Sequence, residues 1–159
     1  MERKKVLTNT TDIFLDNMLF HGASSAAVMV YQKGQLNHYN STSTVWQDFY
    51  STTKAASNCH LAQAGTNMVR QNFKSFSIVW NAMRPNNDDS MYLNEERERL
   101  DHGHGISICE ALPNDTLFGI ILTGRRCDVN FADLVLKNKA NLHTYISRIK
   151  SEINKIYQH

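Results

Sequence analysis

The sequence has few of the residues that typify extracellular, fibrous or linker-rich proteins. Only 3 of its 159 residues are cysteine and only 2 are proline. The three cysteines, Cys59, Cys109 and Cys127, are odd in number, widely spaced and form no CxxC pair, a pattern typical of reduced thiols rather than of a disulfide framework. No internal repeat or low-complexity linker interrupts the chain, whose length corresponds to about one domain. We therefore expect residues 1–159 to form one domain without disulfide bonds.

Long apolar runs are also missing. No run approaches the roughly 20 residues needed to span a bilayer. The opening residues MERKKVLTNT lack the apolar core of a signal peptide. We expect a cytoplasmic protein that makes no contact with a membrane.

An excess of one charge is absent as well. The formal net charge is +2, and basic and acidic residues are interspersed along the whole length. No basic stripe supports nucleic-acid binding by charge alone. No GxGxxG or GxxxxGK[ST] segment is present, so nothing indicates a phosphate-binding loop. With 42% hydrophobic and 20% charged residues, the composition is that of an ordinary globular protein.

Hydrophobic periodicity predicts helices that alternate with antiparallel hairpins. The expected elements are a short helix that starts after an N-cap at 10–12 and ends before Gly22, a hairpin (26–32 and 35–39), a helix from residue 46, a helix over 61–71, a strand over 76–80, a loop over 84–89, a helix over 92–100, a second hairpin (105–109 and 117–122) and one long amphipathic helix over 131–156. This order predicts an α/β fold of the α+β type. It is a central antiparallel sheet with helices packed on its faces, a sandwich of the PAS/GAF kind.

The helix expected over 92–100 carries the charged run EERER. Glu95 and Arg99 stand four residues apart, the spacing of a solvated helical ion pair. We expect the whole run to form a helix face in contact with solvent.

Cysteine and histidine allow an alternative based on metal binding or catalysis. Cys59 precedes His60, and Cys109 lies near His102 and His104. Adjacent helical residues point in different directions, and the HExxH and Cys₂His₂ spacings are absent. The apolar strand around Cys109 favours a structural thiol. We expect no metal, no cofactor and no enzymatic activity, and keep a Cys/His metal protein or enzyme as the third hypothesis.

Three aromatic residues suggest a binding pocket. Trp46 and Tyr50 share one face of the predicted helix, and Trp80 ends the strand over 76–80. Tryptophan and tyrosine combine a large apolar surface with one polar group, which suits a pocket for an amphipathic ligand. Polar residues precede Trp46, so we expect its side chain to be only partly buried. Its replacement by phenylalanine should then leave the stability of the free protein nearly unchanged.

The order of these residues resembles a known family. Trp46-x-x-x-Tyr50, a strand that ends in Trp80 and a strand that opens with Gly-Ile-Ser-Ile at 105–108 are similar to the signature of LuxR-type autoinducer-binding domains of bacterial transcription regulators. The resemblance extends over roughly residues 10–156. It implies a quorum-sensing domain that binds an acyl-homoserine lactone or another amphipathic small molecule.

The resemblance also implies roles for individual residues. Trp46 would donate its indole N–H to the lactone carbonyl, and Tyr50 would hydrogen-bond to the acyl amide oxygen. Trp80 would pack over the lactone ring. Gly105 would admit the ligand close to the backbone, and Ser107 would offer a hydroxyl near the amide.

One position departs from the family pattern. The family has Asp-Pro nine residues after the tyrosine, and Cys59-His60 stand there in this chain. A buried amide without its acceptor costs about 1–3 kcal/mol. Either Asn58 or Asn81 replaces the acceptor, or the ligand differs, or no ligand binds.

The resemblance implies partners as well. We expect a homodimer formed through the last helix. DNA contact would need a helix-turn-helix domain, which this chain lacks, so the chain is either a piece of a longer regulator or a separate sensor. The second hypothesis is a ligand-free interaction or dimerisation module that modulates a regulator.

Overall fold

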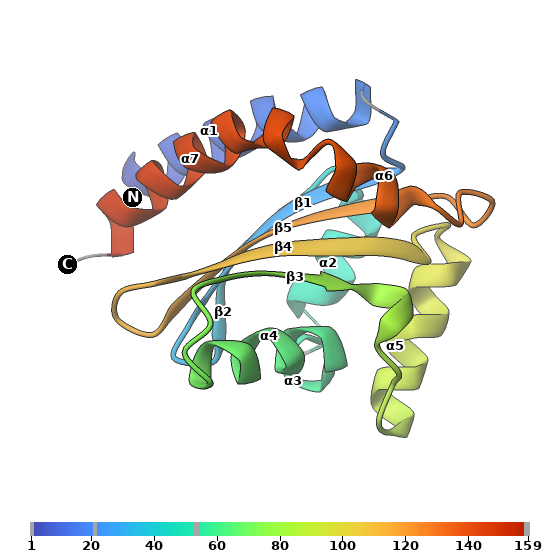
Figure 1. Cartoon of the computed structure of the whole chain (residues 1–159). Coiled ribbons are helices and arrows are strands. Elements are labelled where there is room, and N and C mark those ends of the chain that lie inside the picture. The colour runs from blue at the N-terminus through green and yellow to red at the C-terminus, as the bar shows by residue number, and fades with distance from the viewer. Residues whose placement is uncertain (1, 21, 53–54, 158–159) are drawn as a thin grey trace.

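The computed structural model describes residues 2–20, 22–52 and 55–157 (Figure 1). A five-stranded sheet in the order β2-β1-β5-β4-β3, in which every pair is antiparallel, forms its centre. The elements are α1 (Glu2–Phe20), β1 (Ser25–Gln32), β2 (Gln35–Ser41), α2 (Thr44–Thr52), α3 (Ala55–Asn58), α4 (His60–Arg70), β3 (Ser75–Val79), the 3₁₀ turn η1 (Trp80–Ala82), α5 (Asp88–Arg99), β4 (His104–Leu112), β5 (Thr116–Gly124), α6 (Phe131–Lys137) and α7 (Lys139–Tyr157). The α+β architecture and both predicted hairpins are confirmed.

Helices cover both faces of the sheet, which therefore separates two cores. Helices α1, α6 and α7 lie over one face, and α2 to α5 lie over the other (Figure 1). In β1, Ala26, Val28 and Val30 contribute to the first core, whereas Ala27 and Met29 contribute to the second. This alternation follows from the period of two in a strand. Because both faces are covered, β1 and β5 read as nearly continuous apolar runs.

Turn chemistry sets the register of both hairpins. Lys33 and Gly34 join β1 to β2 with φ of 52° and 76°. Asn114 and Asp115, between β4 and β5, have φ of 62° and 53°. Two consecutive left-handed residues match the right-handed twist of the flanking strands, which fixes the pairing.

Three predicted boundaries are wrong. Helix α1 begins at Glu2 and runs through the expected cap at residues 10–12, because the Thr11 hydroxyl bonds back to the carbonyl of Thr8 and caps nothing. Helix α5 begins at Asp88, inside the predicted loop, where the Asn87 side chain accepts from the backbone N–H of Ser90.

The third error concerns the C-terminal helix, which is two helices and not one. Helix α6 ends at Lys137, and the side-chain amide of the next residue, Asn138, donates to the carbonyl of Leu134. Leu134, an apolar residue of the predicted amphipathic helix, is 56% exposed. An asparagine that hydrogen-bonds its own helix backbone competes with helix continuation, which accounts for the break.

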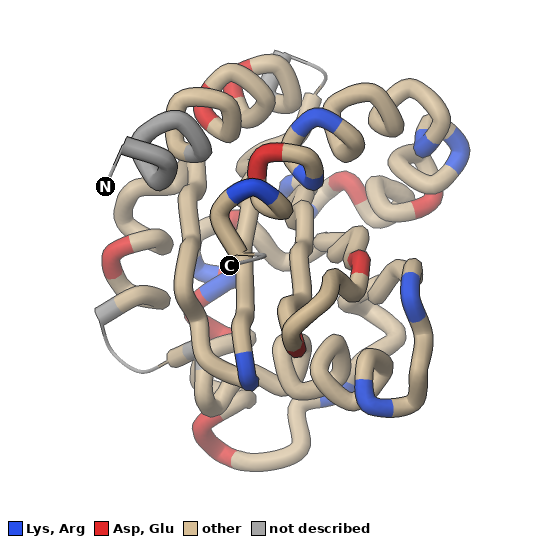
Figure 2. The backbone as a smooth tube through the Cα atoms, turned by 90° about the vertical axis from the view of Figure 1, so that its left-hand side faces the viewer, with Lys and Arg blue, Asp and Glu red and all other residues tan. Residues whose placement is uncertain are grey.

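Charged residues of both signs are interspersed along the backbone, as the sequence predicted (Figure 2). In the described ranges, no helix is both long and apolar enough to cross a bilayer.

Candidate functional site

All six residues of the predicted site lie on the side of the sheet covered by α2 to α5. Helix α2 carries Trp46 and Tyr50, and Cys59 occupies the position before α4. Trp80 begins η1 at the end of β3. Gly105 and Ser107 lie on the central strand β4. Five of the six line one enclosed cavity, which Gly105 adjoins through its contact with the indole of Trp80.

The cavity is nearly closed. Its volume is about 20 Å³, which is room for one water molecule. Away from the aromatic and charged side chains its walls are apolar and include Met29, Leu61, Ala62, Ile78 and Ile121. A ligand larger than water therefore requires movement of the walls.

A buried arginine occupies the polar end of this cavity. Arg97 of α5 is only 3% exposed. Its Cζ lies 5.0 Å from the ring centroid of Trp46 and 5.1 Å from that of Trp80. Its Nη2 donates to the sulfur of Cys59 at 3.0 Å. Two cation–π contacts and one charge-assisted hydrogen bond replace part of the lost hydration of the guanidinium.

The charge of Arg97 controls the ionisation of Cys59. Burial by itself would raise the pKa of this thiol, but the guanidinium and a hydrogen bond with Tyr50 outweigh burial, and the pKa is lowered from its ordinary 9.0. Burial raises the pKa values of Tyr50 and Tyr39 well above the usual value of a tyrosine, so both hydroxyls stay neutral. The pair Cys59–Arg97 is thus the centre of charge in the site.

Both indole N–H groups have partners within the protein. Trp46 donates to the hydroxyl of Tyr39 at 3.0 Å, and Trp80 donates to the hydroxyl of Ser107 at 2.9 Å. Trp46 is 6% exposed, so the expectation of partial burial was wrong. The N-terminal polar residues of α2 reach solvent while Trp46, two positions further on, turns towards the sheet.

Gly105 makes room for Trp80. A Cβ built at position 105 would lie 2.3 Å from Cε3 and 2.5 Å from Cδ2 of that indole. No pair of carbon atoms packs so closely. The space over Gly105 that the resemblance assigns to a ligand is filled by the side chain of Trp80.

The described histidines and cysteines lie apart from one another or have other partners. No cluster of three or more potential metal ligands occurs within residues 2–20, 22–52 and 55–157. Cys59 pairs with Arg97, and burial raises the pKa of Cys109 to about 12. His104, at the start of β4, instead bonds to Asn81 at 2.9 Å in an exposed position.

Arg97 is the site residue that the sequence analysis missed, because it lies within the EERER run that was assigned to solvent. The ion pair of this helix is Arg99–Glu96, at 2.7 Å, and not the predicted Glu95–Arg99. The buried positions of α5 are Ser90, Leu93 and Arg97. Their spacing of three and then four residues marks one helix face, and this spacing was the available signal.

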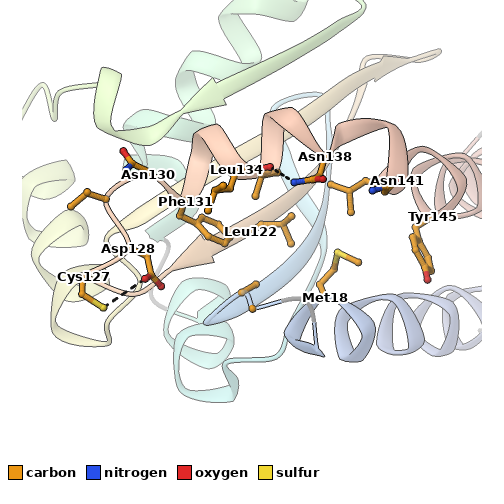
Figure 3. A pocket seen from close by; sticks show the side chains of 15 residues that line it. Met18, Leu122, Cys127, Asp128, Asn130, Phe131, Leu134, Asn138, Asn141 and Tyr145 are labelled. Carbon is orange, nitrogen blue, oxygen red and sulfur yellow. Dashed lines mark hydrogen bonds between the residues drawn. The ribbon is translucent and has the colours of Figure 1, made fainter.

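A second, larger cavity lies on the opposite side of the sheet. It has a volume of about 710 Å³ and lies between α1, β5, α6 and α7. Figure 3 shows the apolar side chains of Met18, Leu122 and Phe131 beside the amides of Asn138 and Asn141. None of the six predicted site residues lines it, and neither does any lysine or arginine whose side chain the structure describes.

No protein-family model matches the chain, and no curated protein matches its sequence. Solved structures match over most of its length. Escherichia coli SdiA superposes with a TM-score of 0.59 at 12% identity, over 95% of this chain and 63% of that one. The ligand-binding domain (LBD) of VqsR from Pseudomonas aeruginosa superposes with a TM-score of 0.55 at 9% identity, over 96% and 92% of the two chains.

CepR2 from Burkholderia cenocepacia, an N-acylhomoserine-lactone-dependent LuxR-family transcription factor, superposes with a TM-score of 0.53 at 11% identity, over 84% of this chain and 74% of that one. This chain thus spans less than two thirds of the SdiA chain and nearly all of the VqsR domain. Similarity at such low identity establishes the fold. The chain has the fold of the ligand-binding domains of LuxR-family regulators, as the order of Trp46, Tyr50, Trp80 and Gly105 predicted.

Proposed function

We propose that this domain senses a small amphipathic molecule, which binds in the cavity between the sheet and helices α2, α4 and α5. One observation carries the proposal. Trp46, Tyr50, Cys59, Trp80 and Ser107, from four separate parts of the chain, converge on one enclosed cavity. The fold that brings them together is shared with CepR2, a factor that depends on an N-acylhomoserine lactone.

The closed cavity supports a sensing mechanism. Pockets for drug-sized ligands have volumes of about 300–1,000 Å³, far above the 20 Å³ present here. A ligand must therefore favour a more open arrangement of α2, α4 and α5. A ligand with different affinities for two arrangements shifts their populations, which is what a sensor requires.

The setting of this sensor follows from the same fold. We propose a cytoplasmic regulator whose DNA contact is made by a helix-turn-helix domain outside this chain. We also propose that two copies pair through α6 and α7, because Leu134 and Leu136 of α6 and Val129, just before α6, expose apolar side chains. We do not propose catalysis, because Cys59 is paired with a cation and not with a general base.

Intrinsic fluorescence can test ligand binding at the proposed site. The chain has two tryptophans, Trp46 and Trp80, and both line this cavity. A ligand there should change the tryptophan emission and also raise the melting temperature. At a ligand concentration of 100 Kd, binding adds about 2.7 kcal/mol to the free energy of unfolding. N-acylhomoserine lactones and the corresponding free acids and amides form the first panel.

Two variants separate this cavity from the larger one. Ala62→Leu adds bulk at an apolar wall of the proposed site and should abolish the fluorescence response. Leu134→Gln alters the larger cavity and should leave the response unchanged. A panel that changes neither emission nor melting temperature would contradict the proposal.

A second candidate function is a ligand-independent interaction module. The supporting observation is that Arg97 already fills the polar end of the cavity. This candidate predicts a dimer by light scattering and no response to any small molecule. A chain that stays monomeric at high concentration would exclude it.

A further inference from the structure

We propose that the ligand of this site is an amphipathic carboxylate and that its carboxylate binds Arg97. This inference rests on the proposed function and specifies its ligand class. The site assignment comes from the buried, incompletely paired guanidinium, which the resemblance to autoinducer-binding domains does not imply.

The first argument is the number of hydrogen-bond donors on Arg97. A guanidinium carries five N–H donors and no acceptor. Nη2 bonds to Cys59, but Nε and Nη1 are buried and find no hydrogen-bond partner among the described residues. The rings of Trp46 and Trp80 contact the cation without supplying lone pairs to these donors. Buried donors in this state favour a ligand that brings acceptor oxygens.

The second argument is charge. The groups that act most strongly on the Arg97 charge are the thiol of Cys59 and the hydroxyls of Tyr50 and Tyr39. None of these is a carboxylate, and burial keeps the two tyrosines neutral. The cation is thus balanced by one sulfur at most. A carboxylate suits this cation because it brings a full negative charge and acceptor oxygens to which the unpartnered Nε or Nη1 can donate.

The third argument is the shape of the lining. Beside Arg97, the lining of the same cavity includes the apolar side chains of Met29, Leu61, Ile78 and Ile121. A ligand that contacts these side chains needs an apolar chain or ring behind its carboxylate. A neutral amide fits less well, because its N–H would meet a site in which donors already exceed acceptors.

A carboxylate at Arg97 would compete with the thiolate of Cys59 for the same cation. Two adjacent buried anions repel each other, so at pH values above the pKa of Cys59 binding should be accompanied by uptake of a proton from solvent by this thiolate. Affinity should therefore fall as pH rises through the ionisation of this thiol. The other titratable groups around it are Tyr31 on β1, Tyr39 on β2, Tyr50 on α2, His60 on α4 and Arg97 itself on α5.

The experiment compares unbranched carboxylates from acetate to decanoate with the matched amides and with N-octanoyl-homoserine lactone. Binding is followed by tryptophan emission and thermal shift at several pH values. We expect at least one carboxylate to bind about tenfold or more tightly than its amide. Arg97→Met should abolish this preference, and Arg99→Met, an exposed arginine on the same helix, should retain it. Cys59→Ser should remove the pH dependence of carboxylate binding.

The outcomes separate the inference from the proposed function. If an amide or the lactone binds and no carboxylate is preferred, the inference is wrong and the sensor proposal stands. If no compound binds, both fail. Retention of the carboxylate preference in Arg97→Met also overturns the inference. Should Arg97→Met not fold, the acid–amide comparison in the unmodified protein and the pH profile of Cys59→Ser decide the question.

Discussion

Replacing Gly105 with alanine should destabilise the protein through Trp80. The new Cβ would lie 2.3 Å from Cε3 of the indole, whereas carbon atoms in contact are about 3.5–4.0 Å apart. The ring must therefore move by more than about 1 Å. It is held by its hydrogen bond to Ser107 and by its contact with Arg97. Overpacking costs about 1–3 kcal/mol, and loss of the buried hydrogen bond costs about another 1–3 kcal/mol.

The expected decrease in unfolding free energy is thus about 2–6 kcal/mol, measured by chemical denaturation. For a chain of this size each kcal/mol lowers the melting temperature by roughly 2–4 °C. Gly119→Ala is a matched control in the neighbouring strand. Its Cβ would meet the flexible end of Met29, whose Cε lies 2.6 Å away and can rotate aside. The control should cost clearly less.

A double mutant tests the mechanism directly. In a Trp80→Ala background the obstructing ring is gone, so Gly105→Ala should cost less than about 1 kcal/mol. Additive effects of the two substitutions would show that the clash is not the cause. A cost for Gly105→Ala no larger than that for Gly119→Ala would refute the reasoning.

Three other predictions concern the charged and aromatic side of the same cavity. Trp46→Phe should lower the unfolding free energy of the ligand-free protein by about 1–3 kcal/mol, because Trp46 is buried and its N–H has a partner. An unchanged denaturation midpoint would contradict this prediction. Arg97→Met should raise the pKa of Cys59, which is read from the pH profile of thiol alkylation in a Cys127→Ser background. An alkylation profile that does not differ from that of the protein with Arg97 would contradict the pairing of Cys59 with Arg97. Because the pKa of Cys59 is lower in the folded protein than its ordinary 9.0, its ionisation adds stability that is complete above about pH 9 and is lost as pH falls through the folded-state pKa. Denaturation curves should therefore show a steeper rise in stability with pH for the unmodified protein than for Cys59→Ser below pH 9, and parallel profiles would oppose this assignment.

The larger cavity between α1, β5, α6 and α7 was not foreseen. It depends on where α6 ends and α7 begins, and that break depends on a side-chain hydrogen bond of Asn138. A sequence pattern in which Phe131, Leu142 and Ile149 recur at helical spacing fits one continuous helix equally well. Periodicity alone does not locate a break caused by a single polar residue.

Local sequence by itself determined the two hairpins of the sheet and the order of the aromatic site residues along the chain. The turns at Lys33-Gly34 and Asn114-Asp115 and the apolar runs beside them specify two hairpins, since turn geometry and strand period are properties of adjacent residues. Tertiary structure alone decided the fate of Arg97. In the run EERER every position looks solvated, and a guanidinium can be buried only where indoles from two other elements and the sulfur of Cys59 surround it. Those partners lie far from Arg97 in the chain, so no local pattern could weigh its desolvation against their contacts.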